Sequence, residues 1–336
     1  MQPDYPFDDL PAPGTTLEIV AGVRWVRMPL PLALDHVNLW LLSDGAAWAA
    51  VDTGLATEAI RDAWRALLPR HPLSRLIVTH FHPDHLGLAA WLQQETGAPL
   101  SMSLGDYQFA RLVHAELPGY AVADMVAFFR RHGLAETMLS ALERRGNAYR
   151  RGVPEIPAAF HRLRDGDRLD IGGRDWLVIA GYGHAPEHCS LYCDALGILI
   201  SGDMLLPKIS TNVPVLSQTP ADDPLADFLA SLGRLAELPA DTLVLPSHGK
   251  PFRGIAARVA ALRRHHEERC AAVLAALDEA RSVAELVPVV FERPITDPHQ
   301  SMFAMGEAMA HVNYLEHRRR VRRHEESGVV RFVKSS

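Results

Sequence analysis

The feature of this sequence that most constrains its fold is a set of five apolar, strand-like segments that each end at a histidine or an aspartate. The strand ends are Asp52, the cluster His80–His85, His184, Asp203 and His248. In an open sheet flanked by helices, ligand-binding groups collect where the strands end. If these segments share one sheet edge, their side chains meet at one place. The sequence therefore predicts an α/β (α+β) protein whose site is assembled from separate segments.

Composition narrows the class of protein. The chain has 336 residues, of which 48% are hydrophobic and 22% charged, and its formal net charge is −6. These values are typical of a globular protein and exclude collagen-like and disordered chains. The acidic balance makes nucleic acid an unexpected main partner, and no apolar run of 18 residues predicts a membrane span.

The N-terminal residues and the cysteines indicate in which cellular compartment the protein is expected. The first residues, MQPDYPFDDLPAPG, are acidic and proline-rich, which is unlike a secretory signal. Three sparse cysteines do not form a disulfide framework and suit a reducing environment. We therefore expect a cytoplasmic protein that does not associate with membranes.

The order of the predicted elements divides the chain into two domains. Strand patterns with intervening helices predict a catalytic domain over residues 17–254, with a helical insert at about 106–151. Residues 255–336 carry a broad apolar helical stripe, two further helical patterns and the short strand GVVRFV. Helix, helix and β-ribbon in this order predict a small winged-helix-like C-terminal domain.

The segment H-F-H-P-D-H at 80–85 has the spacing of a metal-binding motif. His80 and His82 lie two apart on an extended backbone, so both can lean to the same side. The proline that follows biases His82 away from a helical conformation. Asp84 and His85 come after a turn and can face a second ion. The motif alone therefore offers ligands to two metal ions.

The remaining strand ends complete both sites. A catalytic zinc ion takes three protein ligands and a water molecule. We expect two sets of three ligands and one bridge: His80, His82 and His184; Asp84, His85 and His248; and the bridging Asp203. Two divalent ions, two aspartates and a hydroxide leave a charge of about +1 for a developing oxyanion. The pattern predicts hydrolysis by a metal-bound hydroxide that Asp84 and Asp203 orient and bridge.

These motifs resemble those of the metallo-β-lactamase superfamily. Members carry T-H-x-H-x-D-H, a G-H histidine, a bridging S-G-D aspartate and a late S-H-G histidine, and this chain has them at 79–85, 183–184, 201–203 and 247–249. The resemblance spans roughly residues 17–250. It implies a four-layer αββα sandwich, here with a helical insert and a C-terminal appendage. The chain is similar to glyoxalase II-like and lactonase-like hydrolases, and to bacterial hydrolases with a winged-helix-like C-terminal domain.

The resemblance also implies roles for single residues. Asp52 is expected to orient ligands from behind rather than to bind metal. His82 stands where di-iron relatives commonly have a carboxylate, and an imidazole there suits zinc. Two Zn²⁺ per chain are expected, with manganese or iron as alternatives. The loop G-Y-G-H-A-P-E-H (181–188) departs from the usual T-P-G-H-T-P-G-H, and the signature for glutathione binding after Asp203 has no clear counterpart.

Three activities remain open at this point. The first is hydrolysis of a small ester, thioester or lactone, with Tyr182 and Lys208 as candidate substrate contacts because they flank ligands. The second is a nuclease or phosphodiesterase that holds nucleic acid through the arginines of Arg318–Arg323. The third is an iron-dependent, persulfide dioxygenase-like oxidoreductase. The arginine run is interpreted first as a solvated helix end or an interface, and a homodimer is a possible assembly.

The helical insert has two interpretations. As a lid, it would shape an apolar substrate pocket over the metals with side chains such as Phe109, Phe128 and Phe129. Alternatively, these aromatic residues only pack the insert onto the protein. Both interpretations can hold for different residues.

Overall fold

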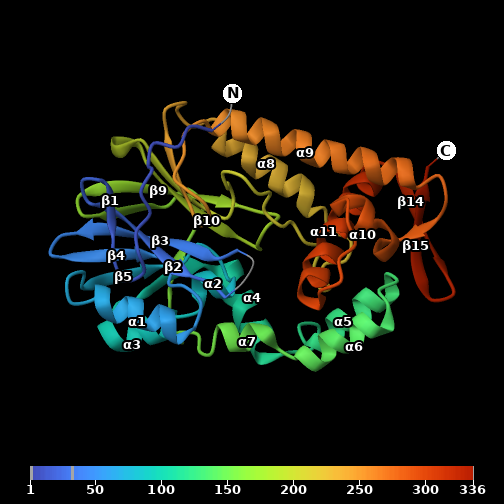
Figure 1. Cartoon of the computed structure of the whole chain (residues 1–336), viewed down its shortest axis with the longest axis horizontal. Coiled ribbons are helices and arrows are strands. Elements are labelled where there is room, and N and C mark those ends of the chain that lie inside the picture. The colour runs from blue at the N-terminus through green and yellow to red at the C-terminus, as the bar shows by residue number, and fades with distance from the viewer. Residues whose placement is uncertain (1–2, 32–33, 336) are drawn as a thin grey trace. The chain divides into compact units, whose positions relative to one another are not determined.

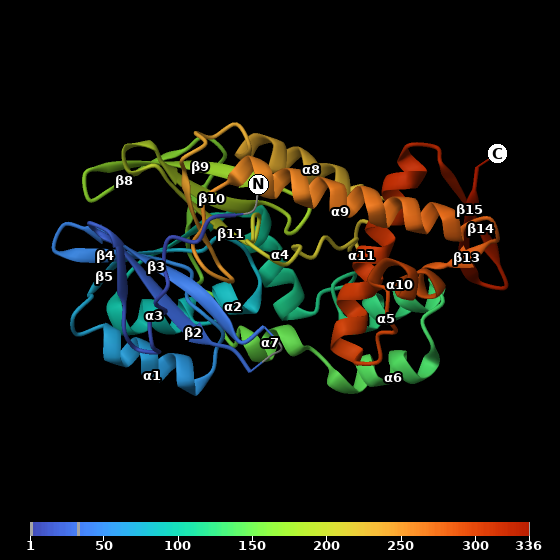
Figure 2. The ribbon, with the colours of Figure 1, turned by 45° about the horizontal axis from the view of Figure 1, so that its top comes forward.

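The computed structural model describes residues 3–31 and 34–335, and the chain forms two compact units (Figures 1 and 2). The first, called the sandwich unit here, comprises Met1–His114, Tyr149–Thr211 and Ser231–Arg258. The second, called the helical unit, comprises Ala115–Ala148, Asn212–Ala230 and Val259–Ser336. The domain boundary near residue 254 stays a prediction.

A seven-stranded sheet forms one half of the sandwich unit, with its strands in sequence order from β1 to β7. The strands are β1 (Leu17–Val20), β2 (Val23–Pro29), β3 (His36–Asp44), β4 (Ala47–Val51), β5 (Leu73–Ile77), β6 (Leu100–Ser103) and β7 (His161–Leu163). Pairing is antiparallel from β1 to β4 and parallel from β4 to β7. The parallel strands β4 and β5 therefore end at the same edge, as the positions of Asp52 and the His80 cluster require.

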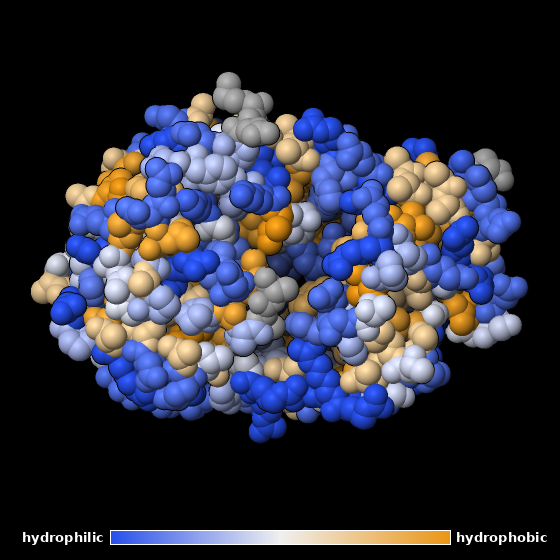
Figure 3. Space-filling model, viewed as in Figure 1, coloured by the Kyte–Doolittle hydropathy of each residue, from blue (hydrophilic) through white to orange (hydrophobic). Residues whose placement is uncertain are grey.

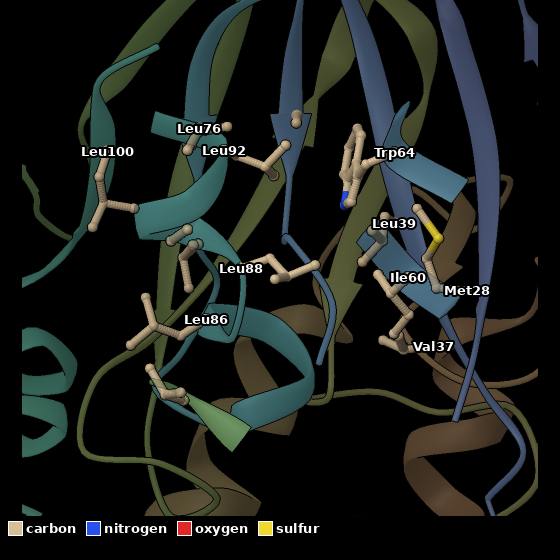
Figure 4. Packing of buried hydrophobic residues seen from close by; sticks show 14 of the residues in the cluster. Met28, Val37, Leu39, Ile60, Trp64, Leu76, Leu86, Leu88, Leu92 and Leu100 are labelled. Carbon is tan, nitrogen blue, oxygen red and sulfur yellow. The ribbon is translucent and has the colours of Figure 1, made fainter. Parts of the chain in front are cut away.

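Helices cover the outer face of this sheet. They are α1 (Glu58–Leu67), the short α2 (Pro83–Leu86) and α3 (Ala89–Thr96). The side chain of Thr57 accepts a hydrogen bond from the Ile60 backbone N–H and so caps the start of α1. Ile60 and Trp64 of α1 then pack on Met28 and Leu39 of the sheet (Figure 4). The packing fixes the frame from which the ligand loops emerge.

A second sheet lies against the first (Figures 1 and 2). Its order is β12-β11-β10-β9-β8, from β8 (Arg168–Ile171), β9 (Arg174–Gly181), β10 (His188–Cys193), β11 (Ile198–Gly202) and β12 (Leu243–Pro246). Side chains of both sheets share one buried core, which includes Trp25, Trp40 and Trp176. Along β3, Leu39 belongs to the outer core and Trp40 to this inner one, as the period-two alternation of a strand requires.

The fourth layer is the C-terminal half of α8 (Pro224–Leu235). Ser231 accepts a hydrogen bond from the Tyr182 N–H at 2.9 Å, and Arg234 donates to the Ala180 carbonyl at 2.9 Å. This half of the helix thus lies beside β9. Helices, two sheets and a helix confirm the αββα sandwich. Two more helices belong mainly to this unit, α4 (Leu104–Ala115) and α7 (Ala148–Gly152).

The helical unit is built around α11 (Pro298–His317), which is buried on nearly every side between Ser301 and Leu315. It also contains α5 (Val122–Arg131), α6 (Glu136–Arg145), α10 (Val283–Phe291) and most of α9 (Ile255–Ala276). A small antiparallel sheet has the order β13 (Arg281–Ser282), β15 (Val329–Lys334), β14 (Val321–Glu326). The predicted helices and terminal strand are therefore present, while the winged-helix description stays a prediction.

The two middle helices of the predicted insert, α5 and α6, fall in the helical unit. Phe128 and Phe129 are buried there, and the Phe128 ring lies 4.6 Å from the ring of His132. α5 packs against β15, and α6 packs against α11. For these two phenylalanines the contacts favour the packing interpretation. Phe109 of α4 instead contacts the ring of Phe81 at 4.6 Å in the sandwich unit.

Within the described residues, every helix is too short or too polar to cross a membrane. The face shown in Figure 3 is mainly hydrophilic, with its hydrophobic residues in scattered groups.

Candidate metal centre

The strand ends of the sandwich unit bring the ligand-type side chains together. His80, His82, Asp84 and His85 follow β5, and the other three follow β9, β11 and β12: His184, Asp203 and His248. Five of these side chains are buried, whereas His82 and Asp84 are half-buried. The seven residues predicted to bind metal therefore converge.

The first set of ligand atoms is formed by three imidazoles. His80 Nε2 lies 2.9 Å from His82 Nδ1 and 3.2 Å from His184 Nε2. Two nitrogens about 2.05 Å from a tetrahedral ion stand roughly 3.3 Å apart. Both distances from His80 Nε2 are close to that value, and the ligand atoms of this set all lie within 4.8 Å of one another. The three imidazoles could therefore hold one ion.

The second set has similar spacing. Asp84 Oδ2 lies 3.6 Å from His85 Nε2 and 3.5 Å from His248 Nε2. Asp203 joins the two sets, because its Oδ2 is 3.6 Å from His184 Nε2 while its Oδ1 is 3.4 Å from His248 Nε2. One carboxylate thus presents one oxygen to each set. This is the geometry of a bridging ligand in a dinuclear centre.

Two orphaned atoms test whether these residues suit a metal. His85 Nε2 and Asp203 Oδ1 are buried, and neither has a hydrogen-bond partner of normal geometry among the described residues. They lie 3.7 Å apart. Burying polar atoms without a partner is costly. A cation between them would satisfy both, so the residues present fit a metal ion.

Protonation also favours metal binding at the first set. Burial, reinforced by the neighbouring histidines, holds the pKa of His80 and His82 well below the usual value. Both imidazoles therefore stay neutral and keep a lone pair for a metal at neutral pH.

The second set is dominated by negative charge. Burial opposes a charge on His85, but the carboxylates of Asp84, Asp52 and Asp203 outweigh it and raise the pKa of His85 to about 10. Burial likewise opposes the charge of Asp203, yet the surrounding histidines hold its pKa well below the usual range. Carboxylates gathered this closely attract positive charge, which a metal ion supplies as well as a proton does.

Asp52 lies behind the ligands rather than among them. Its Oδ2 is 2.8 Å from His85 Nδ1, the nitrogen that faces away from the site. Its Oδ1 accepts hydrogen bonds from the backbone and hydroxyl of Thr79. The residue adopts a left-handed conformation, with φ of 65°. These contacts fix the orientation of the His85 ring and are those expected of a supporting residue.

His248 has supports that the sequence did not reveal. Its Nδ1 donates to the His36 carbonyl at 2.8 Å. Asn38, fully buried in β3, donates to the carbonyls of Pro246 and Gly249 on either side of the ligand. A polar residue inside the apolar run HVNLWLL was the available signal, because buried polar side chains in strands need a purpose.

Asp106 connects the loops that carry the first set. Its Oδ1 accepts from the Phe81 N–H at 2.8 Å, between two ligands, and its Oδ2 accepts from the Glu187 N–H at 2.7 Å. Glu187 returns the link, since its carboxylate accepts from the Gly105 N–H at 2.9 Å. Burial raises the pKa of Asp106 to about 7 despite these bonds. Nothing local in the sequence distinguishes Asp106 from a helix-start residue.

His188 and the cysteines are not among the converging atoms. His188 Nε2 accepts from the Asp203 backbone N–H at 3.2 Å, so it supports the bridge from behind. A side chain on Gly202 would meet that ring at 2.2 Å, which explains the glycine there. Cys189 and Cys193 are buried free thiols, and burial raises the pKa of each. Both side chains belong to the buried core between the two sheets.

The structure also shows the surroundings of the two candidate substrate contacts and of the arginine run. The Tyr182 side chain is exposed, and Lys208 lines a pocket together with His248. In the helical unit, Arg318 pairs with Asp223, and Arg323 pairs with Glu316. Part of the arginine run is therefore already neutralised.

Comparison with known proteins gives a family match over both parts of the chain. The profile described as "Metallo-beta-lactamase superfamily" matches residues 32–248, and "Metallo-beta-lactamase-like, C-terminal domain" matches residues 270–335. Among curated relatives, the "Probable metallo-hydrolase YqjP" of Bacillus subtilis is 27% identical over 95% of this chain and 98% of its own. A hydroxyacylglutathione hydrolase of Pseudomonas putida is 30% identical over 65% of this chain and 64% of its own.

Two solved structures match nearly the whole chain. A β-lactamase domain protein from Burkholderia ambifaria is 47% identical, with a TM-score of 0.92, and the match covers 99% of this chain and 98% of that one. A metallo-β-lactamase family protein from Thermus thermophilus is 31% identical, with a TM-score of 0.80, over 95% of this chain and 100% of that one. The similarity thus extends over both units.

Proposed function

The chain belongs to the metallo-β-lactamase superfamily, and we propose that it is a dinuclear zinc hydrolase of small esters, thioesters or lactones. The observation that carries the proposal is the carboxylate of Asp203, which presents one oxygen to each of two ligand sets. Hydrolysis as the general activity is supported by the metallo-hydrolase relatives.

Zinc is favoured by the chemistry of the ligands. Five imidazoles and two carboxylates, one of them the bridge, suit zinc better than the all-oxygen sets preferred by magnesium or calcium. His82 contributes a nitrogen where a carboxylate would favour iron. When bound, two such ions lower the pKa of a water molecule toward neutrality and polarise the scissile carbonyl.

The side chains of this protein would do the rest. Asp84 has the most exposed of the carboxylates of the site, with 21% of its side chain accessible, so this carboxylate would be available to accept a hydrogen bond from an attacking water and orient it. Asp203 holds the two ligand sets at a fixed separation, and Asp52 keeps the His85 ring aligned. Because these groups are fixed before substrate arrives, little reorganisation is needed during the reaction. Tyr182 remains a proposed substrate contact, since its exposed ring precedes the ligand His184 by two positions.

The acyl class is supported by the relatives named hydroxyacylglutathione hydrolase. These matches cover under two thirds of the relatives' own length. We therefore propose an acyl ester, thioester or lactone without naming glutathione.

Metal content and a substrate panel test this proposal. The purified protein is analysed for zinc, iron and manganese, then assayed with lactones, acyl thioesters and phosphodiesters. Two zinc ions per chain with acyl hydrolysis support it. Two ions with phosphodiester cleavage support a nuclease instead, and salt-sensitive RNA binding should then weaken when Arg318–Arg320 are neutralised. One iron with oxygen consumption supports a dioxygenase-like oxidoreductase and overturns the proposal.

A further inference from the structure

The small sheet of the helical unit has one open edge. Its order is β13-β15-β14, so among the described residues β15 is paired on both sides and β14 on one side only. β14 has the sequence V-R-R-H-E-E, and of these residues only Val321 is buried. The backbone N–H and C=O groups along the free side of such a strand are available to pair with another strand.

The charges of β14 are sorted by sign along the strand. Two arginines precede His324, and two glutamates follow it. Charged side chains on an edge strand ordinarily prevent pairing. When two copies of this strand run antiparallel with His324 opposite itself, however, each arginine lies opposite a glutamate of the other copy. The pairs are Arg322 with Glu326 and Arg323 with Glu325, and two-fold symmetry makes each of them occur twice.

The backbone of β14 permits this alignment. The Ser335 N–H donates to the Arg320 carbonyl at 2.9 Å, and the pairing of β14 with β15 continues from there without a register shift. Hydrogen-bonded and non-hydrogen-bonded pairs alternate along an antiparallel ladder. The N–H and C=O groups of Arg323 and Glu325 therefore point away from β15. In the alignment centred on His324 these two residues lie opposite each other, so their free groups can bond.

Other alignments of the two strands are unfavourable. Moving one copy by a single residue places the outward backbone groups opposite groups that are already bonded to β15. Moving it by two residues places either Arg323 or Glu325 opposite its own counterpart, and like charges directly opposite each other are destabilising. Backbone and charge therefore select the same alignment.

The ion pairs within one chain leave the charges of β14 accessible. Arg322 is exposed and has no carboxylate partner among the described residues. Glu326 pairs with Arg331 at 3.0 Å, yet 63% of its side chain is exposed. Glu325 likewise pairs with Arg131 at 3.3 Å and is 56% exposed. Both carboxylates can thus accept a second partner from another copy.

We propose that β14 pairs antiparallel with β14 of a second copy of this chain, with His324 on the two-fold axis. The two three-stranded sheets then form one continuous sheet across the dimer. One pair of strands buries less surface than a protein–protein interface of standard size, so the dimer is weak and depends on concentration. The inference is independent of the proposed hydrolase function.

Exchanging the charges tests the alignment. The full chain is studied by sedimentation velocity over a range of concentrations. Arg322→Glu makes both contacts between Arg322 and Glu326 repulsive, and so does Glu326→Arg. We expect the Kd of each variant dimer to rise about tenfold or more. An equimolar mixture of the two variants has opposite charges at both contacts, so it should form a heterodimer with a Kd close to that of the wild type.

A cysteine on the two-fold axis tests the geometry. Opposed residues of a non-hydrogen-bonded pair have Cα atoms about 4.5 Å apart, which is within the span of a disulfide. His324→Cys should therefore give a disulfide-linked dimer under mild oxidation, seen in non-reducing electrophoresis. Arg322→Cys is the matched control, because the two copies of this position lie about 14 Å apart along the strands and should stay unlinked. The natural cysteines are buried and common to both variants.

A charge reversal elsewhere is the control for net charge. Arg293→Glu changes an exposed arginine outside the small sheet and should leave the Kd of the dimer unchanged. A wild type that stays monomeric at millimolar concentration overturns the interface. A dimer that neither charge reversal weakens, or that both cysteines link equally, overturns it as well, because its contacts then lie elsewhere. Failure of the mixture to restore the dimer overturns the alignment.

Discussion

Each unit of this protein buries histidines and carboxyl groups, yet these groups are arranged differently in the two units. In the sandwich unit, imidazoles from separate loops direct their ring nitrogens toward two common points, one shared with Asp203 and the other with Asp84. In the helical unit, His266 and His311 belong to helices and direct a nitrogen at each other, 3.2 Å apart. His311 also donates to the Glu307 carbonyl one turn earlier.

The difference shows what makes a buried histidine a metal ligand. Burial is shared, and it lowers the pKa of His80 and of His266 alike. What differs is convergence: the nitrogens of the sandwich unit leave room for a cation among several ligand atoms. In the helical unit His266 Nδ1 and His311 Nε2 face each other, and the buried His266 Nε2, which has no hydrogen-bond partner, belongs to no group of ligand atoms among the described residues. The carboxyl group of Glu307 likewise accepts a hydrogen bond from Asn212 at 2.8 Å and faces no second ligand set among the described residues. We interpret the helical cluster as structural.

Removing the bridge should have the largest effect. Asp203→Ala takes an oxygen from each ligand set, so we expect loss of both ions and a fall in turnover of more than about a thousandfold. Metal analysis and steady-state kinetics measure this. Glu307→Gln removes a buried carboxyl from the other cluster and should keep full metal content. If both variants lose metal equally, the distinction between the clusters is wrong.

The helical cluster should instead respond to pH. Burial raises the pKa of Glu307 to about 7 from an ordinary value of 4.5. The folded state therefore binds this proton more tightly than the unfolded state does, and its stabilising effect is complete below about pH 4.5 and lost as pH rises to about 7. A shift of this size corresponds to about 3 kcal/mol.

Glu307→Gln removes that dependence, because glutamine does not titrate and can still accept from Asn212. Denaturation at pH 5 and pH 8 should show the variant gaining up to about 3 kcal/mol relative to the wild type at the higher pH. Other groups, such as Asp106, titrate in both proteins and cancel in this difference. If the difference in stability between the variant and the wild type is the same at pH 5 and pH 8, Glu307 is not buried as a neutral acid.

Asp106 should have an intermediate effect on the metal centre. Asp106→Asn keeps the size of the side chain but replaces one acceptor oxygen by a donor, so either the Phe81 or the Glu187 N–H loses its partner. Supporting residues of this kind typically change metal affinity about 10- to 100-fold. We expect weaker metal binding at the first set, measured by competition with a chelator. Full affinity in the variant would mean that the two loops hold their ligands without this connection.

The sequence predicted the ligand set far better than its supports. Ligands could be recognised because each follows an apolar strand and because His80, His82, Asp84 and His85 occur together. Their supports are single polar residues far away in the chain, such as Asn38 and Asp106, and only the folded backbone shows which loop each one holds. The sequence also did not show what α5 and α6 pack against, because an apolar helix face indicates that the helix is buried but not which element covers it.

The smallest effect on metal content is expected at His188. His188→Ala removes an acceptor for the Asp203 N–H and leaves a cavity beside His80, whose ring centre is 5.0 Å away. Stability should fall by about 1–3 kcal/mol, as for other buried groups that lose a hydrogen bond. Both ions should remain, because no ligand atom has been removed. Metal analysis of this variant together with Asp203→Ala tests the prediction. A loss of metal equal to that in Asp203→Ala would make His188 a ligand. A metal content near that of the wild type would limit its role to supporting Asp203.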